Sequence, residues 1–140
     1  KMPKKIKAGD FTKQGFSFFS GSILVSQSIN ISINASERYI LKFDRPNAVY
    51  VDIFINDKFV KGVAWTPYEI DITDFVKDGE NKLSFRLYSG NRNLLGPHHY
   101  IGGESYNVGT GTFTDRAGWS DSIKGNIWRD SYCFVQFGIK

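Results

Sequence analysis

The feature that most constrains this chain is a strand, turn and strand unit at residues 68–88. Apolar and acidic residues alternate at residues 68–72, which is the period of a half-buried strand. Thr73 suits the N-cap of a helical turn, and Gly79 can adopt the left-handed conformation that ends one. Alternation resumes at residues 81–88, with the apolar residues on one face. The unit therefore predicts two strands separated by a single helical turn.

The same period-2 alternation covers most of the chain. It predicts one bent strand or a strand pair in residues 22–33, strands in residues 37–43 and 48–55, and a closing strand at 132–139. Residues 48–55 are apolar on both faces, which is typical of a central strand covered on both sides. Helical periodicity appears nowhere over ten residues. The pattern predicts an all-β domain, either a two-sheet sandwich or a barrel.

Two connections are distinctive. Asn56 and Asp57 suit the turn of a hairpin, although the glycine that usually follows is replaced by a lysine. Residues 89–130 are rich in Gly, Asn, Ser and Thr and are far longer than an ordinary loop. Long loops in compact domains are functional or contain strands, and we expect short strands at residues 93–95 and 110–113.

Several motifs carry a resemblance to a known family. The run Pro-Tyr-Glu-Ile-Asp-Ile-Thr at residues 67–73, followed by Gly-Glu-Asn, resembles the jelly-roll sugar-binding domain of family 2 glycoside hydrolases. The run Asn-Arg-Asn-Leu-Leu-Gly-Pro-His-His resembles one in C-terminal β-sandwich modules of large bacterial glycosidases. So do the segments at residues 103–104, 111–113 and 132–139. The resemblance covers about residues 14–139. It implies a galactose-binding-domain-like jelly roll with one short helical turn, acting as a non-catalytic module that braces the catalytic domain of its parent chain.

Charge and length limit the domain organisation. The net charge is +4, and residues 1–13 hold five lysines against one aspartate, so the remainder is neutral. We interpret residues 1–13 as a basic linker or lead and residues 14–140 as one domain. A neutral fold argues against a nucleic-acid partner, and no apolar run is long enough for a membrane span. We expect a piece of a longer chain, whose compartment the sequence leaves open.

The acidic residues do not predict catalysis. Glycoside hydrolysis normally needs two carboxyl groups that flank the scissile bond. The glutamates are four, and Glu104 alone lies in the long loop, without an evident acidic partner in sequence. An independent enzyme using Glu104 and a histidine is the least favoured alternative.

No cofactor is expected. His98 and His99 are adjacent and therefore do not share the face of a strand, and the further Cys or His ligands of a zinc site are missing. We expect one imidazole to cap backbone groups and the other to be solvated. The resemblance leaves a structural calcium ion open, although no carboxylate cluster identifies its ligands. Cys133 is expected to be a small buried core residue.

Aromatic residues make up 16% of the chain and suggest a carbohydrate site. An aromatic ring can receive the apolar face of a sugar while neighbouring polar groups bind its hydroxyls. An alternative is that these rings pack against a neighbouring domain, without affinity for sugars. The candidate carbohydrate-binding residues are Trp65, Arg92, Asn93, His98, His99, Tyr100, Glu104, Trp119 and Trp128.

Overall fold

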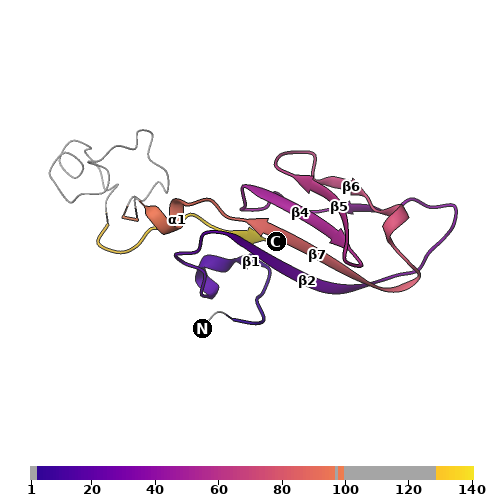
Figure 1. Cartoon of the computed structure of the whole chain (residues 1–140), viewed down its shortest axis with the longest axis horizontal. Coiled ribbons are helices and arrows are strands. Elements are labelled where there is room, and N and C mark those ends of the chain that lie inside the picture. The colour runs from indigo at the N-terminus through magenta and orange to yellow at the C-terminus, as the bar shows by residue number, and fades with distance from the viewer. Residues whose placement is uncertain (1–2, 97, 100–128) are drawn as a thin grey trace.

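The computed structural model describes residues 3–96, 98–99 and 129–140 (Figure 1). Strands dominate this part of the chain, and helices are limited to short segments. The helices are α1 (Arg92–Leu95) and two 3₁₀ turns, Phe11–Gln14 and Thr73–Phe75. The strands are β1 (Gly9–Asp10), β2 (Ser22–Ile31), β3 (Ile40–Lys42), β4 (Tyr50–Ile55), β5 (Lys58–Val63), β6 (Glu69–Asp71), β7 (Gly79–Tyr88) and β8 (Gly138–Ile139).

One layer is a four-stranded antiparallel sheet in the order β2-β7-β4-β5. Its longest members, β2 and β7, run side by side along the molecule (Figure 1) and pair from Ser22 with Tyr88 to Ile31 with Gly79. The predicted hairpin turn joins β4 and β5, with Asn56 and Asp57 at φ 51° and 64°. Positive φ at both residues is the geometry of a type I′ turn, which asparagine and aspartate tolerate without the usual glycine.

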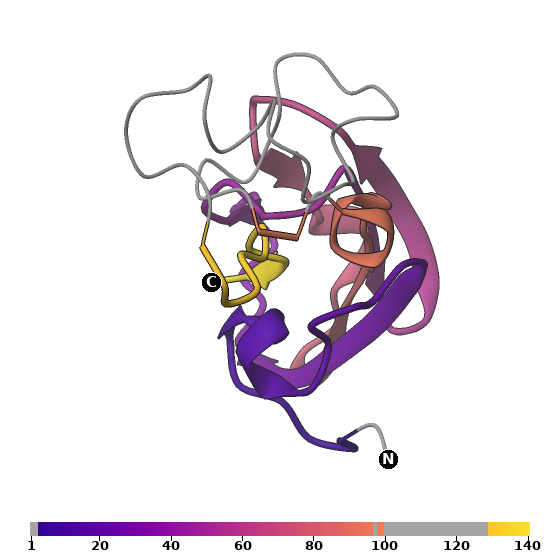
Figure 2. The ribbon, with the colours of Figure 1, turned by 90° about the vertical axis from the view of Figure 1, so that its left-hand side faces the viewer.

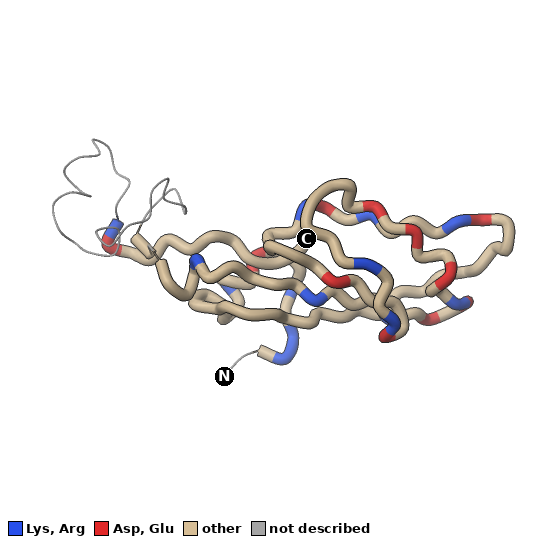
Figure 3. Tube along the Cα trace, turned by 45° about the horizontal axis from the view of Figure 1, so that its top comes forward, with Lys and Arg blue, Asp and Glu red and all other residues tan. Residues whose placement is uncertain are grey.

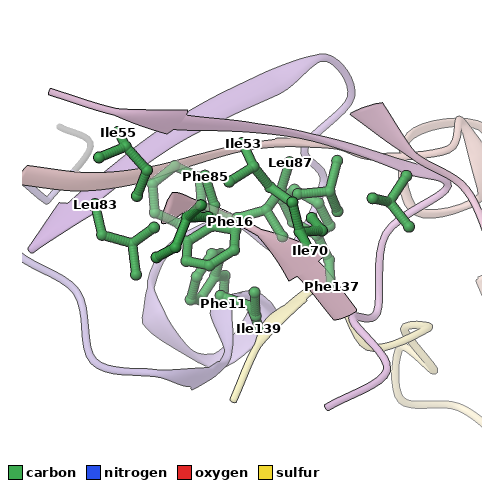
Figure 4. Close-up of a cluster of buried hydrophobic side chains, with 13 residues drawn as sticks. Phe11, Phe16, Ile53, Ile55, Ile70, Leu83, Phe85, Leu87, Phe137 and Ile139 are labelled. Atoms are coloured by element: carbon green, nitrogen blue, oxygen red, sulfur yellow. The ribbon is translucent and has the colours of Figure 1, made fainter. Parts of the chain in front are cut away.

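The second layer contains two short antiparallel pairs, β3 with β6 and β1 with β8. An isolated bridge between Asn47 and Gly138 connects the segment after β3 to β8. This layer faces the long sheet across a core formed by both (Figure 4). The predicted all-β sandwich class is confirmed.

The core follows from the alternation of side chains along the strands. Val51, Ile53 and Ile55 of β4 are buried together with alternate residues of β7 from Asn81 to Leu87. Phe11, from the first 3₁₀ turn, is 1% exposed and meets Phe137 edge-on at 5.8 Å between ring centroids. Residues 9–12 therefore pair and pack with the rest of the fold, and the division into residues 1–13 and 14–140 stays a prediction.

Of the two alternatives for residues 22–33, the structure has the single strand, Ser22–Ile31. It corrects three other predictions about the strands. Strand β4 is central but is covered on one side only, since Tyr50 on its other face is 38% exposed. The closing strand is limited to Gly138–Ile139 and pairs in the second layer. Residues 93–95 belong to α1, because the backbone N–H of Leu95 donates to Asn91 O at 2.9 Å.

The turn between β6 and β7 also differs from expectation. Thr73 is the first residue of the 3₁₀ turn rather than its cap, and its backbone N–H is accepted by the carboxylate of Asp71 at 3.0 Å. Gly79 has the expected positive φ, 84°, but begins β7 instead of ending the turn. Cys133 is only partly buried, which differs from its predicted place in the core.

Charged residues are unevenly distributed over the described fold. Both signs are interspersed at the end of the sandwich away from α1, and a run of lysines follows the N-terminus (Figure 3). In the part of the chain that the structure describes, no helix is both long and apolar enough to cross a bilayer.

Candidate binding site at the α1 end

Helix α1 and the C-terminal segment lie side by side at one end of the sandwich (Figures 1 and 2). The arrangement depends on Asn93, which is buried. Its side-chain Nδ2 donates to Val135 O at 2.7 Å, and Val135 N donates to its Oδ1 at 2.8 Å. The side-chain amide of Asn93 thus makes the two hydrogen bonds that the backbone of Val135 would otherwise make with a neighbouring strand. Asn93 has a structural role here, and carbohydrate binding by this residue stays a prediction.

Both predicted histidines hold backbone groups. His98 Nε2 lies 3.1 Å from Asn93 O, and His99 Nδ1 lies 2.7 Å from Arg129 O. A carbonyl oxygen only accepts, so each of these ring nitrogens carries the proton. The expectation of one capping and one solvated imidazole is therefore half right. Arg129 N also donates to His99 O at 3.0 Å, which joins the two ends of the long loop.

An aromatic cluster surrounds His98 and gives this end a partly exposed, apolar surface. Phe18 meets His98, Tyr132 and Phe134 edge-on at centroid distances of 5.2, 5.1 and 4.8 Å. Tyr132 and Phe134 stack at 5.8 Å, and His99 lies 5.3 Å from Tyr132. We call these five residues the end cluster. Edge-to-face pairs of this kind are favourable beyond the area they bury.

A cavity of about 380 Å³ lies next to α1, between the loop before β4 and the C-terminal segment. Its volume is within the range of small-ligand sites, about 300–1,000 Å³. Among the described residues that line it, none is an aspartate or glutamate, the residue types that glycoside hydrolysis normally needs as a pair. Its polar lining includes Arg45, Asn47, Tyr68, Arg92, Asn93 and Gln136.

The lining groups are held in place by the fold. Asn47 Nδ2 donates to Gln136 Oε1 at 3.2 Å, and its backbone bonds to Gly138 in both directions. Arg92 reaches Cys133 O at 3.5 Å through its guanidinium. These bonds fix polar groups from three distant parts of the sequence around one space.

The structure brings some predicted site residues together and leaves others apart. Arg92 and Asn93 line the cavity, whereas His98 and His99 belong to the end cluster. Trp65, in the connection between β5 and β6, is 78% exposed, and the preceding residue, Ala64, lines the cavity. Other candidates lie outside the described residues, as does the strand expected at 110–113: they are Tyr100, Glu104, Trp119 and Trp128.

Sequence reasoning missed much of the cavity. Arg45 and Asn47 come from a segment with no recognisable motif, and Gln136 was not singled out within the segment at 132–139. Gln136 is far from the other two residues in sequence, and the three come together only in the fold. Phe18 and Tyr132 were also missed, although both are aromatic residues beside irregular segments, which is a usable signal. No group of three or more metal-ligating side chains occurs within the described ranges.

Comparisons with known proteins give similarities in structure only. No family model and no curated protein sequence matches the chain. A rhamnosidase from Novosphingobium sp. PP1Y is 23% identical with a TM-score of 0.50, over 54% of this chain and 7% of the rhamnosidase. A β-D-glucuronidase from Dictyoglomus thermophilum is 22% identical with a TM-score of 0.42, over 51% of this chain and 13% of the glucuronidase. Both are glycoside hydrolases by name. At this identity the similarity to the rhamnosidase establishes the fold alone, over a small part of a much longer protein.

Proposed function

We propose that this chain is a non-catalytic accessory module of a larger glycoside hydrolase and that the cavity beside α1 binds carbohydrate. The observation that carries the proposal is the cavity itself, with its fixed polar groups, its neighbouring aromatic residues and no carboxylate in its described lining. The motif resemblance and the fold shared with 7% of a rhamnosidase support the assignment to an accessory module.

The lining suits the recognition of a sugar ring. Arg45 supplies donors for hydroxyl oxygens, while Gln136 and Asn47 can donate and accept. Tyr68 offers an aromatic face inside the cavity, and Trp65 offers a second one beside it. A neutral sugar needs several weak polar contacts and one apolar surface, which these residues provide together.

Affinity electrophoresis tests the proposal. The purified chain is run in native gels that contain soluble plant or host polysaccharides, together with Arg45→Ala, Gln136→Ala and Trp65→Ala. We expect retardation by at least one glycan. Each loss of a polar contact should weaken binding about fivefold, since a hydrogen bond contributes on the order of 1 kcal/mol.

Phe59→Ala is the matched control. Phe59 is also an exposed aromatic residue, but it follows the Asn56–Asp57 turn on β5, away from the cavity. Retardation should be unchanged in this variant. A glycan that retards the wild type and the three cavity variants equally would exclude the cavity as the site.

An interdomain interface is the second candidate function, because apolar side chains are exposed around the same cavity. Val49 lines it, and Leu95 and Trp65 are also strongly exposed. Exposed apolar patches mark interaction surfaces. Two results together would favour this function over carbohydrate binding. The mobility of the chain would be unchanged on every glycan, and the chain would self-associate in sedimentation velocity, with less association in Trp65→Ser and Leu95→Ser.

A further inference from the structure

Strand β2 is an edge of the four-stranded sheet, and the described part of the chain places no strand on its outer side. Its sequence, Ser-Ile-Leu-Val-Ser-Gln-Ser-Ile-Asn-Ile, contains no charge, proline or glycine. Its register with β7 is uninterrupted over ten residue pairs. A long, flat, uncharged edge strand is a template for pairing with another strand.

The other edge of the same sheet is protected. Strand β5 carries Lys58 and Lys61, and its register with β4 shifts between Ile53 and Phe54. Lysines and bulges are the usual features that prevent further strand pairing. Because one edge has this protection and the other lacks it, β2 has the properties expected of an edge that receives a partner.

The direction of the backbone groups on β2 follows from two hydrogen bonds. Ser89 N donates to Gly21 O at 2.9 Å, which extends the pairing of β2 with β7 by one residue. On the other side of β7, Asn56 N donates to Lys82 O at 2.9 Å. Bonded and non-bonded pairs alternate in an antiparallel ladder. The even-numbered residues of β2, among them Leu24, Ser26 and Ser28, therefore direct their N–H and C=O groups to the open edge.

A cavity of about 510 Å³ lies along this edge. On β2 it is lined by residues 25–27, which include both inward-facing and outward-facing side chains, and on the opposite side by residues 6–8 and 42–44. Apolar side chains of the core, Leu41 and Phe85 among them, reach into it.

The rim of this cavity is basic. Lys7, Lys42 and Lys140 line it, against the single carboxylate of Asp44. Lys42 is already paired with Glu69 at 2.8 Å, but the other two lysines leave a positive surface. An occupant that carries carboxylates would be favoured over a neutral or basic one.

We propose that the edge of β2 binds an extended polypeptide segment in which apolar and acidic residues alternate, added as a fifth strand of the sheet. Its backbone would bond to the outward N–H and C=O groups of Leu24, Ser26 and Ser28. Its apolar side chains would enter the cavity and its carboxylates would meet Lys7 and Lys140. Strand addition of this kind obtains affinity from main-chain bonds and specificity from alternate side chains.

The test attaches the probe to the full chain. An alternating valine and glutamate segment is fused after Lys140 through a flexible Gly/Ser linker, which gives it a high effective concentration at the edge. Amide hydrogen exchange is then measured by NMR. We expect the amides of Leu24, Ser26 and Ser28 to exchange about tenfold more slowly, or slower still, than in the unfused chain. The same fusion with lysine in place of glutamate should give much less protection.

Two variants keep the test specific. In the fused chain, Ser28→Pro removes an outward N–H without touching the bonds to β7, and protection at Leu24 and Ser26 should be lost. Ser28→Thr retains the N–H and should retain the protection. Absence of protection in the glutamate fusion would overturn strand addition. Equal protection by the lysine fusion would overturn the acidic occupant, and protection that rises with concentration in the unfused chain would identify a second copy instead.

Discussion

Gly138 approaches the backbone of Gly9 so closely that a Cβ atom on Gly138 would lie 2.0 Å from the carbonyl oxygen of Gly9. Gly138 also has φ 146°, a conformation that residues with a side chain rarely adopt. Because Gly138 pairs with both Asp10 in β1 and Asn47, this contact holds three segments of the second layer together.

Gly138→Ala should therefore be strongly destabilising. The backbone of Gly9 cannot move aside without breaking the β1 and β8 pair, so we expect a loss of about 3 kcal/mol or more. Gly79→Ala is the matched control: its φ is also positive, 84°, but nothing lies within 4 Å of the added atom. It should lose about 1 kcal/mol. Urea denaturation measures both, and equal losses would mean that φ alone sets the cost.

Asn93→Ala should loosen the α1 end from the C-terminal segment. The change removes two hydrogen bonds and leaves the N–H and C=O of Val135 without that partner, which costs about 2–3 kcal/mol. Asn93→Asp keeps the acceptor for Val135 N, but it places a buried carboxylate oxygen against Val135 O, so it should be at least as destabilising as Asn93→Ala. Thermal unfolding and exchange of the Val135 amide are the measurements. An Asp variant as stable as the wild type would contradict this assignment.

The strand pattern of the long sheet could be predicted because strand geometry is local. Side chains alternate with period 2, so Leu83, Phe85 and Leu87 had to share a face, and the structure buries all three. Burial of the opposite face could not be predicted from β4 alone. Tyr50 and Phe54 are apolar enough for a covered face, yet no layer formed by the described residues covers them, and their rings pack with neighbours on the same sheet.

Features fixed by distant contacts were less predictable. Phe11 lies among lysines in sequence, and only its contact with Phe137 shows that it belongs to the core. Residues 93–95 are too few for a helical period, and α1 forms because Asn91 accepts its first hydrogen bonds and Val135 binds Asn93. The cavity beside α1 is lined by residues about ninety positions apart, and no local sequence pattern indicates that they come together in the fold.

Acid stability should depend on Asp71. Its pKa lies below the usual range, first because the hydroxyl and backbone N–H of Thr73 donate to its carboxylate, and then because of Arg38. The folded pKa is below the unfolded value of about 3.9, so this contribution is complete above that value and is lost as the pH falls through the folded pKa.

The variant Asp71→Asn reports on this titration. It should be less stable than the wild type near neutral pH, and the difference should shrink below about pH 4. Chemical denaturation midpoints across this pH range provide the measurement. Arg38→Met removes the contribution of Arg38 but keeps both hydrogen bonds from Thr73. Its stability near neutral pH should therefore fall less than that of Asp71→Asn. A stability gap between wild type and Asp71→Asn that is constant with pH would show that the charge of Asp71 has no part in it.

The side chain of Asn81 is 1% exposed, and all of its hydrogen-bonding groups have partners. Its Oδ1 accepts from Lys77 N and from Asn56 Nδ2, both at 2.9 Å, and its Nδ2 donates to Lys77 O and Gly79 O. The network ties the hairpin turn at Asn56 to the turn before β7. Asn81→Leu should lose about 3 kcal/mol, because several buried backbone groups lose their partner at once.

A double-mutant cycle separates the contribution of the link between the two turns. Asn56→Gly keeps the positive φ of the turn, 51°, but removes the amide that reaches Asn81. It should cost less than Asn81→Leu. If the two amides act as one network, the double variant should be more stable than the sum of the single losses predicts, by about 0.5–2 kcal/mol in urea denaturation. Additive losses would mean that each asparagine holds its own turn independently, and the backbone pairing of β4 with β7, including the bond from Asn56 N to Lys82 O, would then be what connects the two turns.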